Sequence, residues 1–269
     1  MEFGFGQAFK WSQHRGHYAP VVITTNYLLL SALIALYYLS QNQLTIDSHT
    51  ALLGLVTGTV FITAMGTMTY ALTQIRASAV LTGFRLSLII PTATSALLWG
   101  EPFTTTQAFG ALLALGALVL MTRDAGALLH LSNLRNLSLV LLVFGLQGTS
   151  LTCLRWVEYA ALSDDQPKFL MVTGLVAGTW GTLLLLLKRR QPQRGEIAIG
   201  AGIGVYNMAA LIVILTALSQ VPGTVFFPLM GCAVVVLDNL ATRILWREPW
   251  APTTLVGVAL ALIAILVVL

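Results

Sequence analysis

The chain contains two similar stretches, and this internal repeat constrains the fold more than any single residue does. Residues 71–120 correspond to residues 217–268, beginning with ALTQ at 71–74 and ALSQ at 217–220. Both copies carry a Glu-Pro pair between two apolar runs, at 101–102 and at 248–249. Shared apolar composition would produce chance leucine matches, but not a charged break at the same place. The repeat therefore predicts two structurally related halves.

The composition indicates a membrane protein. Of the 269 residues, 57% are hydrophobic and 9% are charged, whereas soluble domains have roughly 25% charged residues. A soluble core of this size cannot bury so much apolar surface, so the lipid bilayer must surround most of the chain. We therefore expect an all-α integral membrane protein, multi-pass, in the cytoplasmic (inner) membrane.

Apolar runs predict ten transmembrane helices, each near the ~20 residues that cross ~30 Å of hydrocarbon. Residues 1–16 are too short and polar to span, but FKW at 9–11 resembles LRW at 154–156. We therefore expect a first helix that is truncated relative to its partner, the sixth. Helices 2 to 10 are expected at 18–40, 50–75, 78–100, 104–122, 137–159, 167–187, 197–220, 223–246 and 252–269.

The number of helices in each repeat predicts how the repeats are related. Residues 1–124 are expected to form the first five-helix repeat, 125–136 a linker and 137–269 the second repeat. Because five is odd, the second repeat must enter the membrane upside down, which gives an inverted pair. This symmetry is the usual scaffold for alternating access, with a site near the midplane.

Basic residues in the connections predict the orientation. The even-numbered connections offer little beyond Lys168, with Arg155 near a helix end. The positive-inside rule then places the odd-numbered connections in the cytoplasm and the C-terminus outside. The residues in these odd connections are Lys10, Arg15, Arg76, Arg123, Arg135, Lys188, Arg189, Arg190, Arg194 and Arg247.

The motifs around the two Glu-Pro pairs resemble those of a known family. They comprise WGEP at 99–102 with Gly110, and Phe227-Pro228, REP at 247–249 and Gly257 in the second half. With the helix count, they resemble the drug/metabolite transporter superfamily, specifically its EamA-type members. The resemblance implies a ten-helix carrier whose central cavity is formed mainly by helices 1, 3, 4 and 6, 8, 9. The chain departs from the pattern in its short first helix, in Arg247 and in the absence of basic residues at 40–50.

Two charged residues inside predicted spans are the main functional candidates. Arg85 in helix 4 and Asp238 in helix 9 are expected at similar depth, roughly 11 Å from the same face. A lone charge there is costly, so each needs water, a partner or a ligand. Three alternatives remain. The two residues form a structural ion pair, or Arg85 receives an anionic substrate group while Asp238 is a proton or gating site. In the third, the ion pair breaks and re-forms during the transport cycle.

Neutral polar residues in the apolar helices are the second set of candidates. Interhelical hydrogen bonds alone could account for them, but their concentration in helices 3, 6, 8 and 9 favours a polar cavity. Asn26, in the second predicted helix, is also a neutral amide within an apolar run. With the charged pair, the predicted substrate-binding residues are Arg85, Asp238, Asn239, Gln74, Tyr70, Gln147, Tyr206 and Asn207.

Other polar and small residues have structural interpretations. Glu101 and Glu248 precede prolines that start helices, and a capping role is favoured over a substrate role. The glycine pairs at 54 and 58 and at 200 and 204 predict close helix packing. Cys153 and Cys232 lie in apolar runs and indicate neither a disulfide nor a metal site.

The sequence holds no catalytic constellation and no P-loop, and its histidines lack ligand spacing. We therefore expect no enzyme, no cofactor, no metal and no nucleic-acid partner. The predicted function is secondary active transport of small polar or amphipathic metabolites, with export favoured, driven by protons or exchange. The alternatives are a flippase or carrier for a lipid-linked or sugar-phosphate substrate, or a non-transporting scaffold. Either a monomer or a homodimer is compatible with the sequence.

Overall fold

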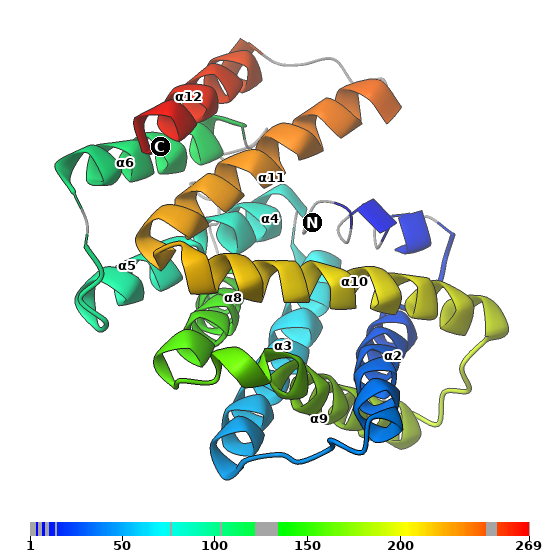
Figure 1. The fold of residues 1–269 in the computed structure, drawn as a ribbon. Helices are drawn as coiled ribbons and strands as arrows, with labels where there is room; N and C mark the ends of the chain where they lie inside the picture. The colour runs from blue at the N-terminus through cyan, green and yellow to red at the C-terminus, as the bar shows by residue number, and fades with distance from the viewer. Residues whose placement is uncertain are drawn as a thin grey trace. The chain divides into compact units, whose positions relative to one another are not determined.

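The computed structural model describes residues 4, 7–8, 11–13, 15–75, 77–102, 104–121, 134–245 and 252–268. Within these ranges all regular structure is helical (Figure 1). Seven helical segments in the described ranges are long and apolar enough to cross a bilayer, from Ala19–Ser40 to Gly223–Ala241. The chain is therefore a multi-pass helical membrane protein, as its composition predicted.

The helices lie where the apolar runs predicted them, with one exception. Half of residues 1–16, where the first helix is predicted, and most of the linker at 125–136 lie outside the described residues, so the count of ten stays a prediction. The elements are α2 (Ala19–Ser40), α3 (Ser48–Gln74), α4 (Ala77–Leu86), α5 (Ile89–Leu97), α6 (Thr105–Met121), α8 (Leu134–Tyr159), η1 (Ser163–Asp165), α9 (Gln166–Leu187), α10 (Arg194–Gln220), α11 (Gly223–Leu245) and α12 (Pro252–Val268).

The exception is the fourth predicted helix, which was expected to run unbroken over 78–100. It is divided into α4 and α5 by a turn at Ser87 and Leu88. Pro91 explains the break, because proline has no N–H for the carbonyl four residues earlier and its ring crowds that carbonyl. The Ser87 carbonyl instead accepts the Ile90 N–H at 3.0 Å. The Ser87 hydroxyl donates to the Phe84 carbonyl at 2.6 Å.

The chain forms two compact units, and each takes segments from both predicted repeats. Unit 1 contains residues 1–66 and 156–219, and unit 2 contains residues 67–155 and 220–269. In unit 1, α2 packs along α9; in unit 2, α6 packs along α12, and α11 packs against α5, α6 and α12 (Figure 1). The predicted repeat boundaries concern sequence similarity rather than compactness, and they stay a prediction.

Glycines allow close helix contacts in unit 1. A Cβ atom built on Gly58 in α3 would lie 2.6 Å from the Thr173 carbonyl oxygen in α9. One built on Gly204 in α10 would lie 2.8 Å from the Asn26 carbonyl oxygen in α2. Since real Cβ contacts are longer than this, only glycine permits these backbones to approach so closely, and the packing role predicted for these two glycines is confirmed.

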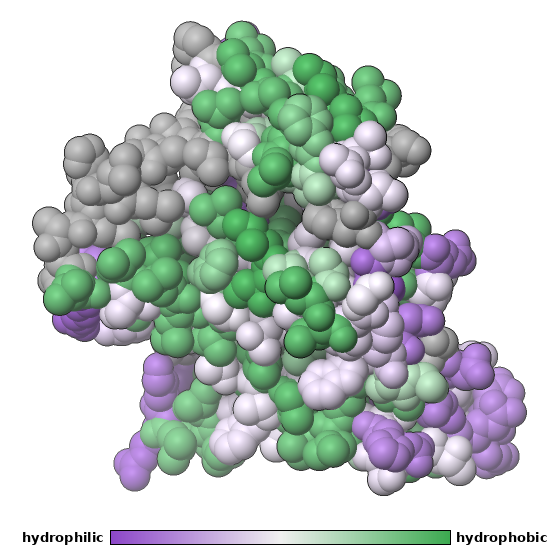
Figure 2. All heavy atoms as spheres, turned by 90° about the vertical axis from the view of Figure 1, so that its left-hand side faces the viewer, coloured by the Kyte–Doolittle hydropathy of each residue, from purple (hydrophilic) through white to green (hydrophobic). Residues whose placement is uncertain are grey.

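Apolar side chains cover much of the surface. Figure 2 shows many hydrophobic side chains on the surface of the molecule. Leu97 is 83% exposed, and Leu186 is 68% exposed. Such surfaces are unfavourable in water and favourable in hydrocarbon, as expected for lipid-facing helices.

Candidate functional site in the membrane-spanning helices

Arg85 lies at a discontinuity in a membrane-spanning helix. It occupies the last turn of α4 and is half-buried, and the turn at Ser87 and Leu88 follows it directly. Broken helices at membrane depth leave backbone polar groups that need partners, and they recur at ion and substrate sites. The sequence identified Arg85 as a candidate but missed the break, although Pro91 within an apolar run was a visible signal.

Asp238 and Asn239 lie on α11. The Asp238 side chain is outside the described part of the structure, so the pairing expected with Arg85 stays a prediction. Asn239 is buried, and its side-chain amide donates to the Val235 carbonyl of the same helix at 2.9 Å. This bond satisfies one amide hydrogen within α11, rather than between helices as the structural alternative expected.

The remaining candidates are divided between the two units. In unit 2, the Tyr70 hydroxyl accepts a hydrogen bond from Arg135 at 3.0 Å. The exposed Gln74 amide donates to the Thr73 hydroxyl at 3.3 Å. Gln147, also in unit 2, is half-buried on α8, while Tyr206 and Asn207 lie on α10 in unit 1. The hydrogen bonds of Tyr70 and Gln74 go to residues outside the predicted set.

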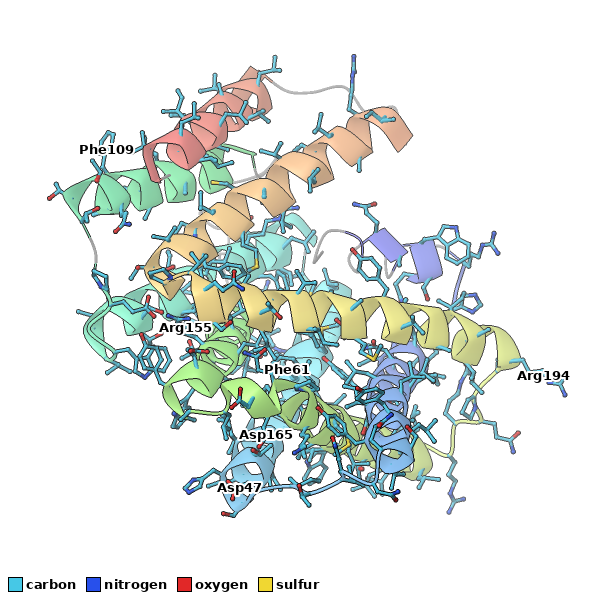
Figure 3. All side chains as sticks on the ribbon, viewed as in Figure 1. Asp47, Phe61, Phe109, Arg155, Asp165 and Arg194 are labelled. Atoms are coloured by element: carbon cyan, nitrogen blue, oxygen red, sulfur yellow. The ribbon has the colours of Figure 1, made fainter. Side chains whose placement is uncertain are left out.

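A buried ion pair in unit 2 was not anticipated. The Arg155 Nε atom lies 2.7 Å from Glu101 Oε1, and their side chains are 6% and 3% exposed. The second carboxylate oxygen of Glu101 accepts the Thr224 backbone N–H at 3.0 Å. Glu101 therefore caps α11, which supports the predicted capping role, although the helix is not the one that follows it in sequence. Arg155, labelled in Figure 3, was assigned only to a helix end.

A second buried carboxylate, Glu196, organises the start of α10 in unit 1. Its Oε1 accepts the Tyr18 N–H at 3.0 Å, and its Oε2 accepts the Gln193 N–H at 2.9 Å. The Arg190 guanidinium donates to Oε1 at 3.2 Å. The Glu196 side chain is 1% exposed, whereas that of Arg190 is 43% exposed. The sequence offered one signal for this site: Glu196 is an acidic residue in a first helical turn.

Asn26 is a third buried polar group, on α2 in unit 1. It is 1% exposed, and both polar atoms of its amide are buried without a hydrogen-bond partner among the described residues. The Thr57 and Thr173 hydroxyls, on α3 and α9, are in the same condition. Unpaired buried polar groups cost free energy, so water or a ligand at these atoms would be stabilising.

An apolar cavity of about 290 Å³ lies within unit 2. It begins at Leu88, three residues after Arg85, and extends along α5, α6 and α11. This lining fits an apolar chemical group rather than a polar one, which differs from the polar cavity that the sequence favoured. The lining residues are Leu88, Ile89, Thr92, Ala93, Ala96, Ala108, Ala111, Leu112, Ala114 and Pro228.

Comparison with known proteins identifies the fold but assigns no function. No family model matches the chain, and no curated protein matches it. A solved structure described as "Crystal structure of protein" is similar, with a TM-score of 0.77 and 14% sequence identity, over 99% of this chain and 96% of that one. At this identity the similarity establishes a shared fold alone.

Proposed function

We propose that the chain is a secondary active transporter of small polar or amphipathic metabolites in the inner membrane, of the EamA type. The observation that carries this proposal is the broken spanning helix with Arg85 at the break. An arginine in a membrane-spanning segment is costly and needs water, a partner or a ligand, and carriers use broken helices to coordinate charged groups.

The helix pairing supports alternating access. In the predicted repeat, α2 and α9 are the second helices of their halves, and α6 and α12 are the fifth. Each helix packs along its repeat partner, α2 with α9 in unit 1 and α6 with α12 in unit 2. Contact between equivalent elements is expected near a pseudo-twofold axis in an inverted-repeat carrier.

The neighbourhood of Arg85 favours an amphipathic anion as the substrate. Its guanidinium suits a carboxylate or phosphate group. Leu88 and Ile89 line the apolar cavity only three and four residues further along. The same cavity is the specific observation in favour of the second candidate, a carrier or flippase for a lipid-linked substrate, which would place a longer apolar chain there.

Transport in proteoliposomes tests the proposal. The full chain would be reconstituted, and uptake of labelled carboxylates, sugar phosphates and amino acids measured with and without a pH gradient. We expect saturable uptake of at least one anion. The second candidate instead predicts movement of a lipid-linked phosphate between leaflets. If no solute moves and none shifts the thermal stability of the purified protein, the transport proposal is wrong.

A further inference from the structure

We propose that unit 1 carries a binding site for the phosphate headgroup of an anionic phospholipid. The site is the basic cluster, defined as Lys188, Arg189, Arg190 and Arg194, which lies between the end of α9 and the start of α10. All four residues are exposed. Arg194 marks this end of α10 in Figure 3. The proposal does not depend on transport.

The cluster is built on a fixed framework rather than on a loose loop. Glu196 holds the connection through the Gln193 N–H and holds the start of α2 through the Tyr18 N–H, a residue 178 positions away in the chain. The Tyr18 ring lies 5.1 Å below the Arg190 guanidinium, and its hydroxyl is 3.5 Å from the Lys188 ammonium. The cationic groups of Lys188 and Arg190 are therefore positioned before any ligand arrives, which lowers the entropy lost on binding.

The charge of the cluster is only partly offset within the framework. Arg190 is paired with Glu196. That pairing leaves Lys188, Arg189 and Arg194 as an excess of positive charge, and no ion pair joins these three to an acid in the described part of the chain. Clustered lysine and arginine at the end of a spanning helix attract anionic headgroups, each residue adding to the affinity.

The backbone at Arg189 is held by the hydrogen bonds that end α9. The Arg189 N–H donates to the Leu186 carbonyl at 3.0 Å and the Arg190 N–H to the Leu185 carbonyl at 3.2 Å, which together form a Schellman motif at the end of α9. Arg189 takes the left-handed position of this motif, with φ of 50°. Glycine is favoured there and any L side chain is disfavoured. Asn42 and Ala161 take the same left-handed conformation after α2 and α8, so this backbone fixes where the Arg189 side chain leaves the end of α9.

The surface beside the cluster indicates a lipid rather than a free phosphate ion. In the last turn of α9, Leu184, Leu186 and Leu187 are 51%, 68% and 73% exposed. They place an apolar surface within one helical turn of the cations. A phospholipid has the same arrangement, with acyl chains below an anionic headgroup, whereas inorganic phosphate would gain nothing from the leucines.

Native mass spectrometry of the purified full chain tests this inference. The probes are phosphatidylglycerol and phosphatidylcholine with identical acyl chains, and inorganic phosphate. The test variant is Arg189→Gln/Arg194→Gln, and the matched control is Arg135→Gln/Arg243→Gln, which removes the same charge from other helix ends. We expect phosphatidylglycerol to be retained over phosphatidylcholine, and the test variant to bind it about 30-fold more weakly while the control binds normally.

Three results would overturn the inference. Equal retention of phosphatidylglycerol by the test variant and the native chain would mean that the arginines serve membrane topology alone. Equal loss in the control variant would mean a general charge effect, and displacement of the lipid by inorganic phosphate would mean a site for a free anion. If the test variant unfolds, Arg189→Lys/Arg194→Lys keeps the charge and is expected to retain the lipid.

Discussion

The two buried glutamates depend on different interactions for their contribution to folding stability, although both belong to the same residue type. Glu101 in unit 2 and Glu196 in unit 1 each accept backbone N–H groups at helix starts and each pair with an arginine. Arg155, the partner of Glu101, is 6% exposed, whereas Arg190, the partner of Glu196, is 43% exposed. Only the first site therefore holds two desolvated charges.

The difference decides what each arginine contributes. A buried charge that loses its partner remains desolvated and uncompensated, which is strongly destabilising. Glu196, in contrast, keeps two backbone N–H donors if Arg190 is removed, and water can replace an exposed guanidinium. We therefore infer that the Glu101 site depends on its ion pair and that the Glu196 site depends on its backbone hydrogen bonds.

The largest effect is expected for Arg155→Met, which removes the charge at similar side-chain length. It leaves the Glu101 carboxylate buried with the Thr224 N–H, and should lower the free energy of unfolding by about 3–5 kcal/mol. Denaturant unfolding in micelles measures this. The double variant Glu101→Gln/Arg155→Met should recover part of the loss. A change below about 1 kcal/mol in the single variant would show that the pair is not desolvated.

An intermediate effect is expected for Glu196→Ala. It leaves the Tyr18 and Gln193 N–H groups without their acceptor, at a cost of about 1–3 kcal/mol. Glu196→Gln should lose less, because its amide oxygen can still accept one bond. The same unfolding assay checks both variants, and equal losses for alanine and glutamine would mean that the charge, rather than the hydrogen bonds, is what matters at this site.

A smaller effect is expected for Arg190→Gln, at about 0–1 kcal/mol, because the guanidinium is partly exposed and screened by salt. Unfolding at low and high ionic strength measures it, and the difference from the native chain should shrink as salt is added. A loss as large as that of Arg155→Met would remove the distinction between the two sites.

The smallest effect is expected at Asp47, an exposed carboxylate that caps a helix. Its carboxylate accepts the His49 backbone N–H at 2.9 Å at the start of α3 (Figure 3). This hydrogen bond holds the pKa of Asp47 below its usual value. The ionised Asp47 therefore stabilises the folded state above the pKa of the carboxyl in the unfolded chain, about 3.9. This contribution is lost as the pH falls through the lower pKa that Asp47 has in the folded protein.

Melting temperatures of Asp47→Ala and of the native chain, measured at several pH values, test this direction of the pH dependence. Asp47→Ala should melt at a lower temperature than the native chain near neutral pH, and the difference should disappear in acid. Asp47→Asn keeps an acceptor oxygen and serves as the control, with little dependence on pH. A difference that grows in acid would contradict the assignment.

The sequence predicted what depends on local pattern. Apolar runs located the helices because a spanning helix has a fixed length in lipid, and the Glu-Pro context predicted that Glu101 would act as a cap. The sequence did not predict that Glu101 caps α11 and pairs with Arg155, because a contact across 54 residues depends on tertiary packing. Arg155 lies one residue from Trp156, and such an arginine is typical of a helix end at the interface.

The break between α4 and α5 was not predicted for a different reason. Pro91 was visible, but membrane-spanning helices tolerate proline when neighbouring groups re-satisfy the backbone. Here the Ser87 carbonyl accepts the Ile90 N–H three residues later, which is a tighter turn than the α-helix, and the helix divides at this point. The buried amide of Asn26 was anticipated by residue type, whereas its lack of a partner among the described residues could come only from the packing around it.

The most direct test of the proposed transport site is substrate exchange in proteoliposomes for two arginine variants. Arg85→Ala removes the guanidinium at the helix break, and Arg243→Gln removes one from the exposed last turn of α11. For an anion that the native chain exchanges, we predict a loss of exchange of about 100-fold or more in Arg85→Ala, as expected when a charged hydrogen bond is removed, and near-native exchange in Arg243→Gln. Equal exchange by both variants would contradict the role of Arg85.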